Sequence, residues 1–73
     1  MELTPEEGKY LLRVRCIDAL NRDDARTLKQ CIDAYYFIEQ AEENDLEVIY
    51  ELKDNTVAIS ARGKRYEIES LEM

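Results

Sequence analysis

The side chains that carry most enzyme chemistry are scarce in this 73-residue chain. It contains no His, which removes the commonest general base and the commonest metal ligand. An active site would need paired carboxylates, an activated Cys or a Lys, and the sequence has no Gly-rich phosphate loop, GxSxG elbow or metal-ligand spacing. We therefore expect a non-catalytic protein that holds no cofactor and no metal.

The two cysteines, Cys16 and Cys31, do not form a CxxC motif. If the two helices described below form a hairpin that turns near Asn21, the Cα atoms of the cysteines are offset by about five residues, or roughly 7 Å along the axis. That offset is too large for a disulfide bridge without backbone movement. We expect both thiols to be reduced, buried and unreactive.

Acidic residues are concentrated between positions 39 and 54, where seven acids face the single Lys53 and give a local charge of −6 in a chain of −7. They are Glu39, Glu42, Glu43, Asp45, Glu47, Glu51 and Asp54. One interpretation is a solvated face that keeps the protein soluble. The other is a surface that docks onto a basic, nucleic-acid-handling partner, as a nucleic-acid-mimicking inhibitor from a phage or mobile element does. The acids lack the spacing and the glycine of an EF-hand calcium loop.

A basic turn with an aromatic neighbour follows at positions 62–66. Arg62, Lys64 and Arg65 could contact phosphates there, with Tyr66 stacking on a base. Three positive charges on a chain of net charge −7 would bind nucleic acid weakly and with strong salt dependence. Direct nucleic-acid binding is therefore an alternative, and a plain exposed turn is the simpler interpretation.

Three aromatic residues stand in a row at Tyr35, Tyr36 and Phe37. Successive helical residues point about 100° apart, so the triplet spreads over roughly 200° and cannot fit one core-facing stripe. Either the first helix and the sheet cover different sides of the triplet, or part of it forms an interface, where Tyr and Phe are enriched. The predicted partner-binding residues are Tyr36 and Phe37 as anchors, with Glu39, Glu42, Glu43 and Asp45 as an acidic rim.

The segment Thr4-Pro5-Glu6-Glu7 predicts the start of a first helix. Thr4 can cap it, Pro5 suits the first helical position, and Glu7 completes a capping box. From Tyr10 onward, one set of apolar residues is expected to face the core and a second set to lie beside it. The first set is Leu12, Cys16, Ala19 and Leu20, and the second is Tyr10, Val14 and Ile17.

A break and restart is expected over Asn21-Arg22-Asp23-Asp24, and a second helix follows it. Asn21 is a good capping residue, with Asp24 three positions on. The core-facing residues of the second helix recur at spacings of three or four. They are Ala25, Leu28, Ile32, Tyr35 and Ile38, with Cys31 alongside. The helix should end around positions 42–45, where acids crowd the negative end of the helix dipole.

From Leu46 the apolar period changes from 3.6 to 2, which is typical of strands. Alternation predicts strands over 46–52, 57–61 and 65–70, with turns at 53–56 and 62–64. Such a meander has one apolar face that helices must cover. The sequence thus predicts one α+β domain over residues 1–73, with two N-terminal helices packed on a three-stranded antiparallel β-meander (α-α-β-β-β).

The expected location is the cytoplasm, without membrane contact. The N-terminus is acidic where a secretory signal is basic, and the longest apolar run, 34–38, is far shorter than the roughly 18 residues of a membrane span. A core in a chain below about 80 residues supplies only roughly 3–5 kcal/mol, so a partner is the expected stabiliser. We predict a protein–protein interaction module, with a second copy in a homodimer as its first partner.

Overall fold

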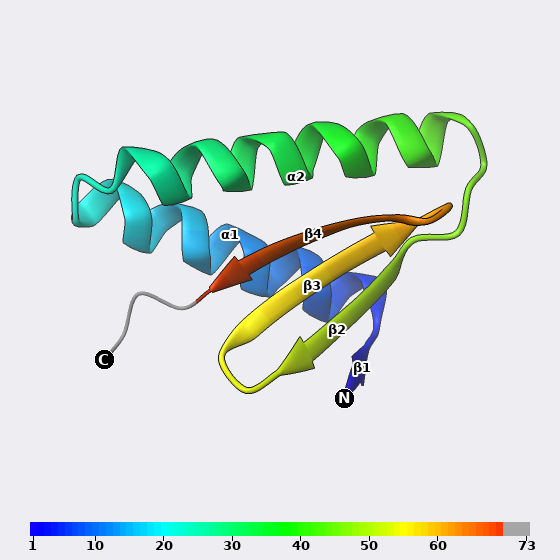
Figure 1. Ribbon diagram of the computed structural model, residues 1–73, viewed down its shortest axis with the longest axis horizontal. Coiled ribbons are helices and arrows are strands. Elements are labelled where there is room, and N and C mark those ends of the chain that lie inside the picture. Colours follow the sequence, from blue (N-terminus) through cyan, green and yellow to red (C-terminus); the bar gives the residue numbers. More distant parts are fainter. Residues whose placement is uncertain (70–73) are drawn as a thin grey trace.

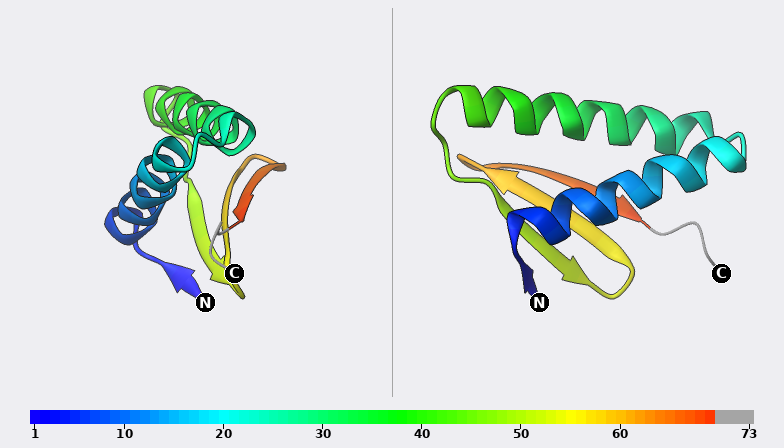
Figure 2. Two further views of the ribbon diagram at one scale, coloured as in Figure 1. Left: turned by 90° about the vertical axis from the view of Figure 1, so that its left-hand side faces the viewer. Right: turned by 180° about the vertical axis from the view of Figure 1, so that it is seen from behind.

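The computed structural model describes residues 1–69 of the chain. Its elements are β1 (Glu2–Leu3), α1 (Pro5–Asn21), α2 (Ala25–Glu43), β2 (Ile49–Lys53), β3 (Thr56–Ala61) and β4 (Lys64–Glu69). The strands pair in the order β1-β2-β3-β4, and the helices form a hairpin on one face of the sheet (Figures 1 and 2). The predicted α+β class and the order α-α-β-β-β are confirmed. Ser70, the end of the last predicted strand, lies outside the described residues.

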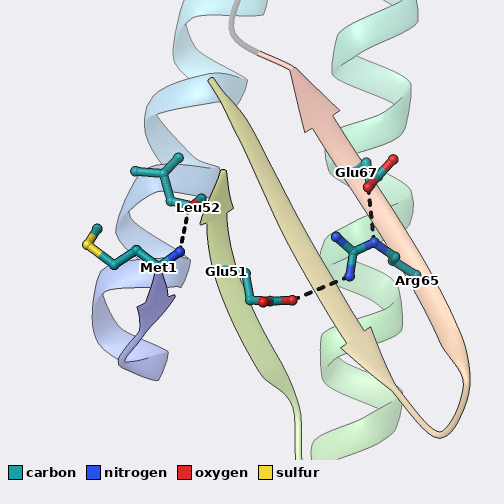
Figure 3. A network of polar contacts seen from close by, with 5 residues as sticks. All are labelled: Met1, Glu51, Leu52, Arg65 and Glu67. Atoms are coloured by element: carbon teal, nitrogen blue, oxygen red, sulfur yellow. Dashed lines mark hydrogen bonds and ion pairs between the residues drawn. The ribbon is translucent and has the colours of Figure 1, made fainter. Parts of the chain in front are cut away.

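The short strand β1 was not indicated by the sequence. Its residue Leu3 lies opposite Tyr50 of β2 in an antiparallel pair. The amino group of Met1 donates to the carbonyl of Leu52 at 3.0 Å (Figure 3). The Leu52 amide donates in return to the Met1 carbonyl at 2.8 Å. The chain start therefore adds a fourth strand at the β2 edge of the predicted meander.

The predicted capping box begins α1. The Glu7 amide donates to Thr4 Oγ1 at 3.1 Å, and the Thr4 amide donates to Glu7 Oε1 at 2.9 Å. The predicted break over residues 21–24 is confirmed, but the expected capping residue Asn21 is wrong by three positions, because α1 includes Asn21 and the N-cap of α2 is Asp24. The Thr27 amide donates to Asp24 Oδ1 at 3.1 Å, which satisfies a backbone donor that the helix start leaves free.

The core lies between the helix hairpin and the sheet. It is formed by Leu3, Leu12, Cys31, Ala34, Ile38, Tyr50, Val57, Ile59 and Ile68. At Gly8, α1 comes so close to β2 that a Cβ atom would overlap the Tyr50 ring. The glycine, which costs helix propensity, is thus required by the approach of Tyr50.

Both helices are rotated relative to the prediction, so that small residues face inward. The inner face of α2 has Cys31, Ala34 and Ala41, whereas Ile32, a predicted core residue, is 57% exposed. Leu20, also predicted in the core, is 59% exposed. Small inward side chains allow close packing of a helix against its neighbours, which leaves the larger ones outside.

Candidate interaction surface

Helix α1 has apolar side chains on two opposite faces. Leu12 and Ala19 are fully buried against the core. Tyr10, Val14 and Ile17 lie on the opposite side, because Tyr10 and Leu12 differ by about 200° around the axis. Tyr10 is 58% and Ile17 52% exposed. The prediction that these three lie beside the core-facing set is therefore wrong, and they form a separate outward stripe.

Helix α2 repeats this arrangement. Its inner face includes Cys31 and Ile38, both buried. Ile32 and Tyr36 lie one turn apart on the outer side, where Tyr36 is 65% exposed. The predicted anchor Tyr36 therefore points to solvent, together with Ile32, which the sequence analysis had assigned to the core.

The two helices touch where Cys16 of α1 lies beside Cys31 of α2. Tyr35 lies at this junction. Burial is the main cause that raises the pKa of its phenol, and the nearby Cys16 thiol adds to it, whereas Arg13 lowers it. We call the exposed apolar side chains of the two helices the helical face. It consists of Tyr10, Val14, Ile17, Leu20, Ile32, Tyr35 and Tyr36.

The second predicted anchor, Phe37, points elsewhere. It is partly buried, and its ring packs against Tyr66 of β4 with 4.8 Å between the ring centroids and 40° between their planes. The structure thus separates the adjacent residues Tyr36 and Phe37, since one faces solvent and the other joins α2 to the sheet. The predicted spread of the aromatic triplet over several sides of the helix is confirmed.

The predicted acidic rim lies at the C-terminal end of α2. Glu39, Glu42, Glu43 and Asp45 are all exposed. Glu42 accepts a hydrogen bond from Lys9 Nζ of α1 at 2.7 Å, and this contact raises the pKa of Lys9. Glu39 and Glu43 lie three and seven positions after Tyr36, on the same side of the helix. The rim therefore borders one end of the helical face.

The predicted nucleic-acid residue Arg65 is engaged in ion pairs on the outer face of the sheet. Its Nε donates to Glu67 Oε2 at 3.0 Å, and its Nη1 lies 3.4 Å from Glu51 Oε1 on β2 (Figure 3). These carboxylates, first of all Glu67, raise the pKa of the Arg65 guanidinium. The positive charge of Arg65 is thus shared between two neighbours in the sheet.

The rest of the basic turn is open to solvent. Arg62 and Gly63 form the hairpin tip with φ angles of 54° and 83°. Such positive φ values are typical of tight hairpin turns, which suit a glycine. Arg62 and Lys64 are exposed, whereas Tyr66, the predicted stacking residue, is occupied by its contact with Phe37. The turn is confirmed, but the structure does not bring all four predicted residues together at the tip.

The two cysteines lie level with each other across the helix hairpin. Cys31 is fully buried, and burial together with a hydrogen bond to Cys16 raises the pKa of its thiol to about 12. The predicted offset of about five residues is wrong because the turn lies at residues 22–24 and not at Asn21. Both cysteines are free thiols, and Cys16 is only partly buried.

Within residues 1–69, no three acidic or Cys side chains are grouped closely enough to hold a metal ion. Neither helix of this described part has the length and apolar character needed to span a bilayer. Comparison with known protein families, curated proteins and solved structures found no match.

Proposed function

We propose that the protein is a non-catalytic protein-binding module of the cytoplasm and that a partner binds at the helical face. One observation carries the proposal: on the side away from the sheet, both helices expose large apolar side chains to solvent. Contiguous exposed apolar side chains mark binding sites, and Tyr is among the residues that contribute most to binding.

The composition of the helical face supports binding over a purely structural role. A soluble helix normally has charged or polar residues opposite its core-facing stripe. Here Tyr10, Ile17, Ile32 and Tyr36 take those positions. Fully burying a side chain such as Ile is worth about 1.5–3 kcal/mol. The side chains of the helical face are already partly buried, so a partner would gain only part of that free energy from each of them.

The acidic rim supports the same location. Glu39 and Glu43 are exposed on α2 after Tyr36, so they would place charge at one border of the apolar contact. Interfaces commonly have such an apolar centre and polar border, in which the charges select and orient the partner.

The two alternatives from the sequence have weaker support. Nucleic-acid binding at 62–66 would have to proceed without Arg65 and Tyr66, which are engaged within the sheet and with Phe37. An inhibitor that mimics nucleic acid would use the acidic rim, where Glu42 is already paired with Lys9.

Site-specific photo-crosslinking tests the proposal. The photoreactive residue p-benzoylphenylalanine would replace Tyr36 in one variant and Lys53, an exposed residue of β2, in a matched control. We expect protein adducts from position 36 and few from position 53, with mass spectrometry identifying the attached chain. Equal yields at both positions, or no adduct from position 36, would contradict binding at the helical face.

A further inference from the structure

The outer side of α2 has an ordered sequence of side-chain types. Its positions follow spacings of four and three, so they lie along one side of the helix. From the hairpin end onward they are Ala25, Lys29, Ile32, Tyr36, Glu39 and Glu43, all exposed. We call this row the α2 seam. Its centre is apolar, one end has a cation, and the other end has two carboxylates.

The α2 seam is complementary to itself when reversed. Ile32 and Tyr36 lie two residues on either side of Ala34, Lys29 and Glu39 lie five residues on either side, and the outermost pair lies nine. From this we infer that the partner at the helical face is a second copy of the chain, whose α2 packs antiparallel on α2 across a twofold axis level with Ala34. The inference rests on the proposed function and names its partner.

This arrangement matches both shape and charge. Ile32 of one copy would pack on Tyr36 of the other, which removes the most exposed apolar side chains of α2 from water. Lys29 would lie level with Glu39 of the second copy, and symmetry makes this contact twice. A parallel pairing would instead place Lys29 on Lys29 and Glu39 on Glu39, where like charges repel.

Helix α1 fits the same axis. The hydrogen bond between Cys16 and Cys31 at the helix junction places residue 13 of α1 level with residue 34 of α2. The electrostatic effect of Arg13 on Tyr35, one position further along α2, agrees with this level. Tyr10 and Ile17 lie almost equally far on either side of that level. The twofold axis that pairs the two α2 helices therefore also brings Tyr10 of one copy toward Ile17 of the other. Both outward stripes would be covered in one assembly.

Charge reversal at the two ends of the α2 seam tests the arrangement. Lys29→Glu and Glu39→Lys each place like charges together in a homodimer, so we expect each variant to weaken dimerisation at least about tenfold in Kd. A mixture of the two variants restores opposite charges at both contacts. We expect the heterodimer to form with a Kd within about threefold of the wild-type value. Sedimentation velocity measures all four samples, with Lys53→Glu on the sheet as a charge-matched control.

The outcomes separate the two proposals. Both variants change exposed side chains, and circular dichroism would verify that each remains folded. If the single variants dissociate and the mixture does not recover, the antiparallel twofold arrangement is wrong. If the wild type is monomeric while position 36 crosslinks to a different protein, the second copy is wrong and the proposed function stands. If neither self-association nor crosslinking occurs, both proposals fail.

Discussion

The outer face of the sheet and the helical face are both open to solvent, but their side chains differ in kind. On the sheet, Glu51, Ala58 and Glu67 are cross-strand neighbours, and Arg65 pairs with both glutamates. These long side chains leave Ala58 only 2% exposed. The helical face instead consists of seven large apolar side chains, six of them more accessible than Tyr35 at 37%.

The contrast shows how a small domain can leave one of its faces apolar. The sheet covers its outer backbone with its own charged side chains, so that face needs no partner. The helices place Gly8, Ala19, Ala34 and other small residues inward, which permits tight packing, and several large apolar residues lie outside. The inner faces of the helices thus determine stability, and the outer faces are available for association.

The largest expected change in stability comes from a substitution that disrupts the close packing between α1 and the sheet. Gly8→Ala should lower the free energy of unfolding by at least about 3 kcal/mol, because the added methyl group overlaps the Tyr50 ring. Helix propensity alone would predict a gain of about 1 kcal/mol. Chemical denaturation measures the difference. The control Gly63→Ala meets no atom within 4 Å and should cost only about 1 kcal/mol for its positive φ angle. A Gly8→Ala variant as stable as wild type would contradict the close approach.

Two isoleucines of α2 compare the inner and outer faces directly. Ile38 is 3% exposed and Ile32 57%. Ile38→Ala should lower the free energy of unfolding by about 3 kcal/mol through the cavity it leaves. Ile32→Ala should change it by less than about 0.5 kcal/mol at concentrations where the protein is monomeric. Urea unfolding of dilute samples provides both values, and similar losses for the two variants would show that α2 has no free outer face.

A smaller effect concerns pH and the buried thiol. The pKa of Cys31 is raised from its ordinary value of 9.0 to about 12, so the unfolded chain releases this proton at lower pH than the folded chain. Stability from this group is therefore complete below pH 9 and is lost as the pH rises toward 12. Burial also raises the pKa values of Tyr35 and Tyr50, which add in the same direction.

The Cys31→Ala variant isolates the contribution of the Cys31 thiol to the pH dependence of stability. Urea midpoints at about pH 8 and about pH 10.5 should fall less for the variant than for wild type. The tyrosines titrate in both proteins and so cancel in the comparison. An identical decrease in both would mean that the Cys31 thiol does not resist ionisation in the folded state.

The smallest expected effect is on the sheet. Arg65→Ala removes the contacts with Glu51 and Glu67, which are exposed ion pairs of the kind that contribute little to stability. We expect a slight decrease in the unfolding midpoint that 1 M salt abolishes, since screening weakens the same contacts in the wild type. Dimerisation should not change. If Arg65→Ala lowered the free energy of unfolding as much as Ile38→Ala, the ion pairs of the sheet would be major contributors to stability, which would contradict this account.

The order and type of the elements could be predicted because each has a clear local signal. The Thr4 capping box and the change of apolar period at Leu46 depend only on neighbours in the sequence. The strand β1 could not be found this way, because its two residues are too few to show a period. It forms only when Leu3 meets Tyr50, a contact between distant parts of the chain.

The inward faces of the helices could not be chosen from spacing alone. In α2, the row through Ile32 and Tyr35 and the row through Cys31 and Ala34 both recur every three or four residues. Hydrophobicity favours the first row, whereas the narrow space beside α1 and the sheet favours the second. The step of about 100° between helical residues was enough to predict Tyr36 as an outward residue. The outward positions of Ile32 and of Tyr10, Val14 and Ile17 were not predicted. Apolar residues on both faces of α1 were the available signal.

The solution mass of the wild type and of Tyr36→Asp tests the central claim most directly. Sedimentation equilibrium at high salt would suppress purely electrostatic association and leave the apolar contact. We expect the wild type to have twice the 8.6 kDa chain mass and folded Tyr36→Asp to have the single mass. At a protein concentration of about 1 mM, dimerisation with any Kd below millimolar would be detected. A wild type that stays at 8.6 kDa up to this concentration would contradict self-association. So would a Tyr36→Asp dimer as stable as the wild-type dimer.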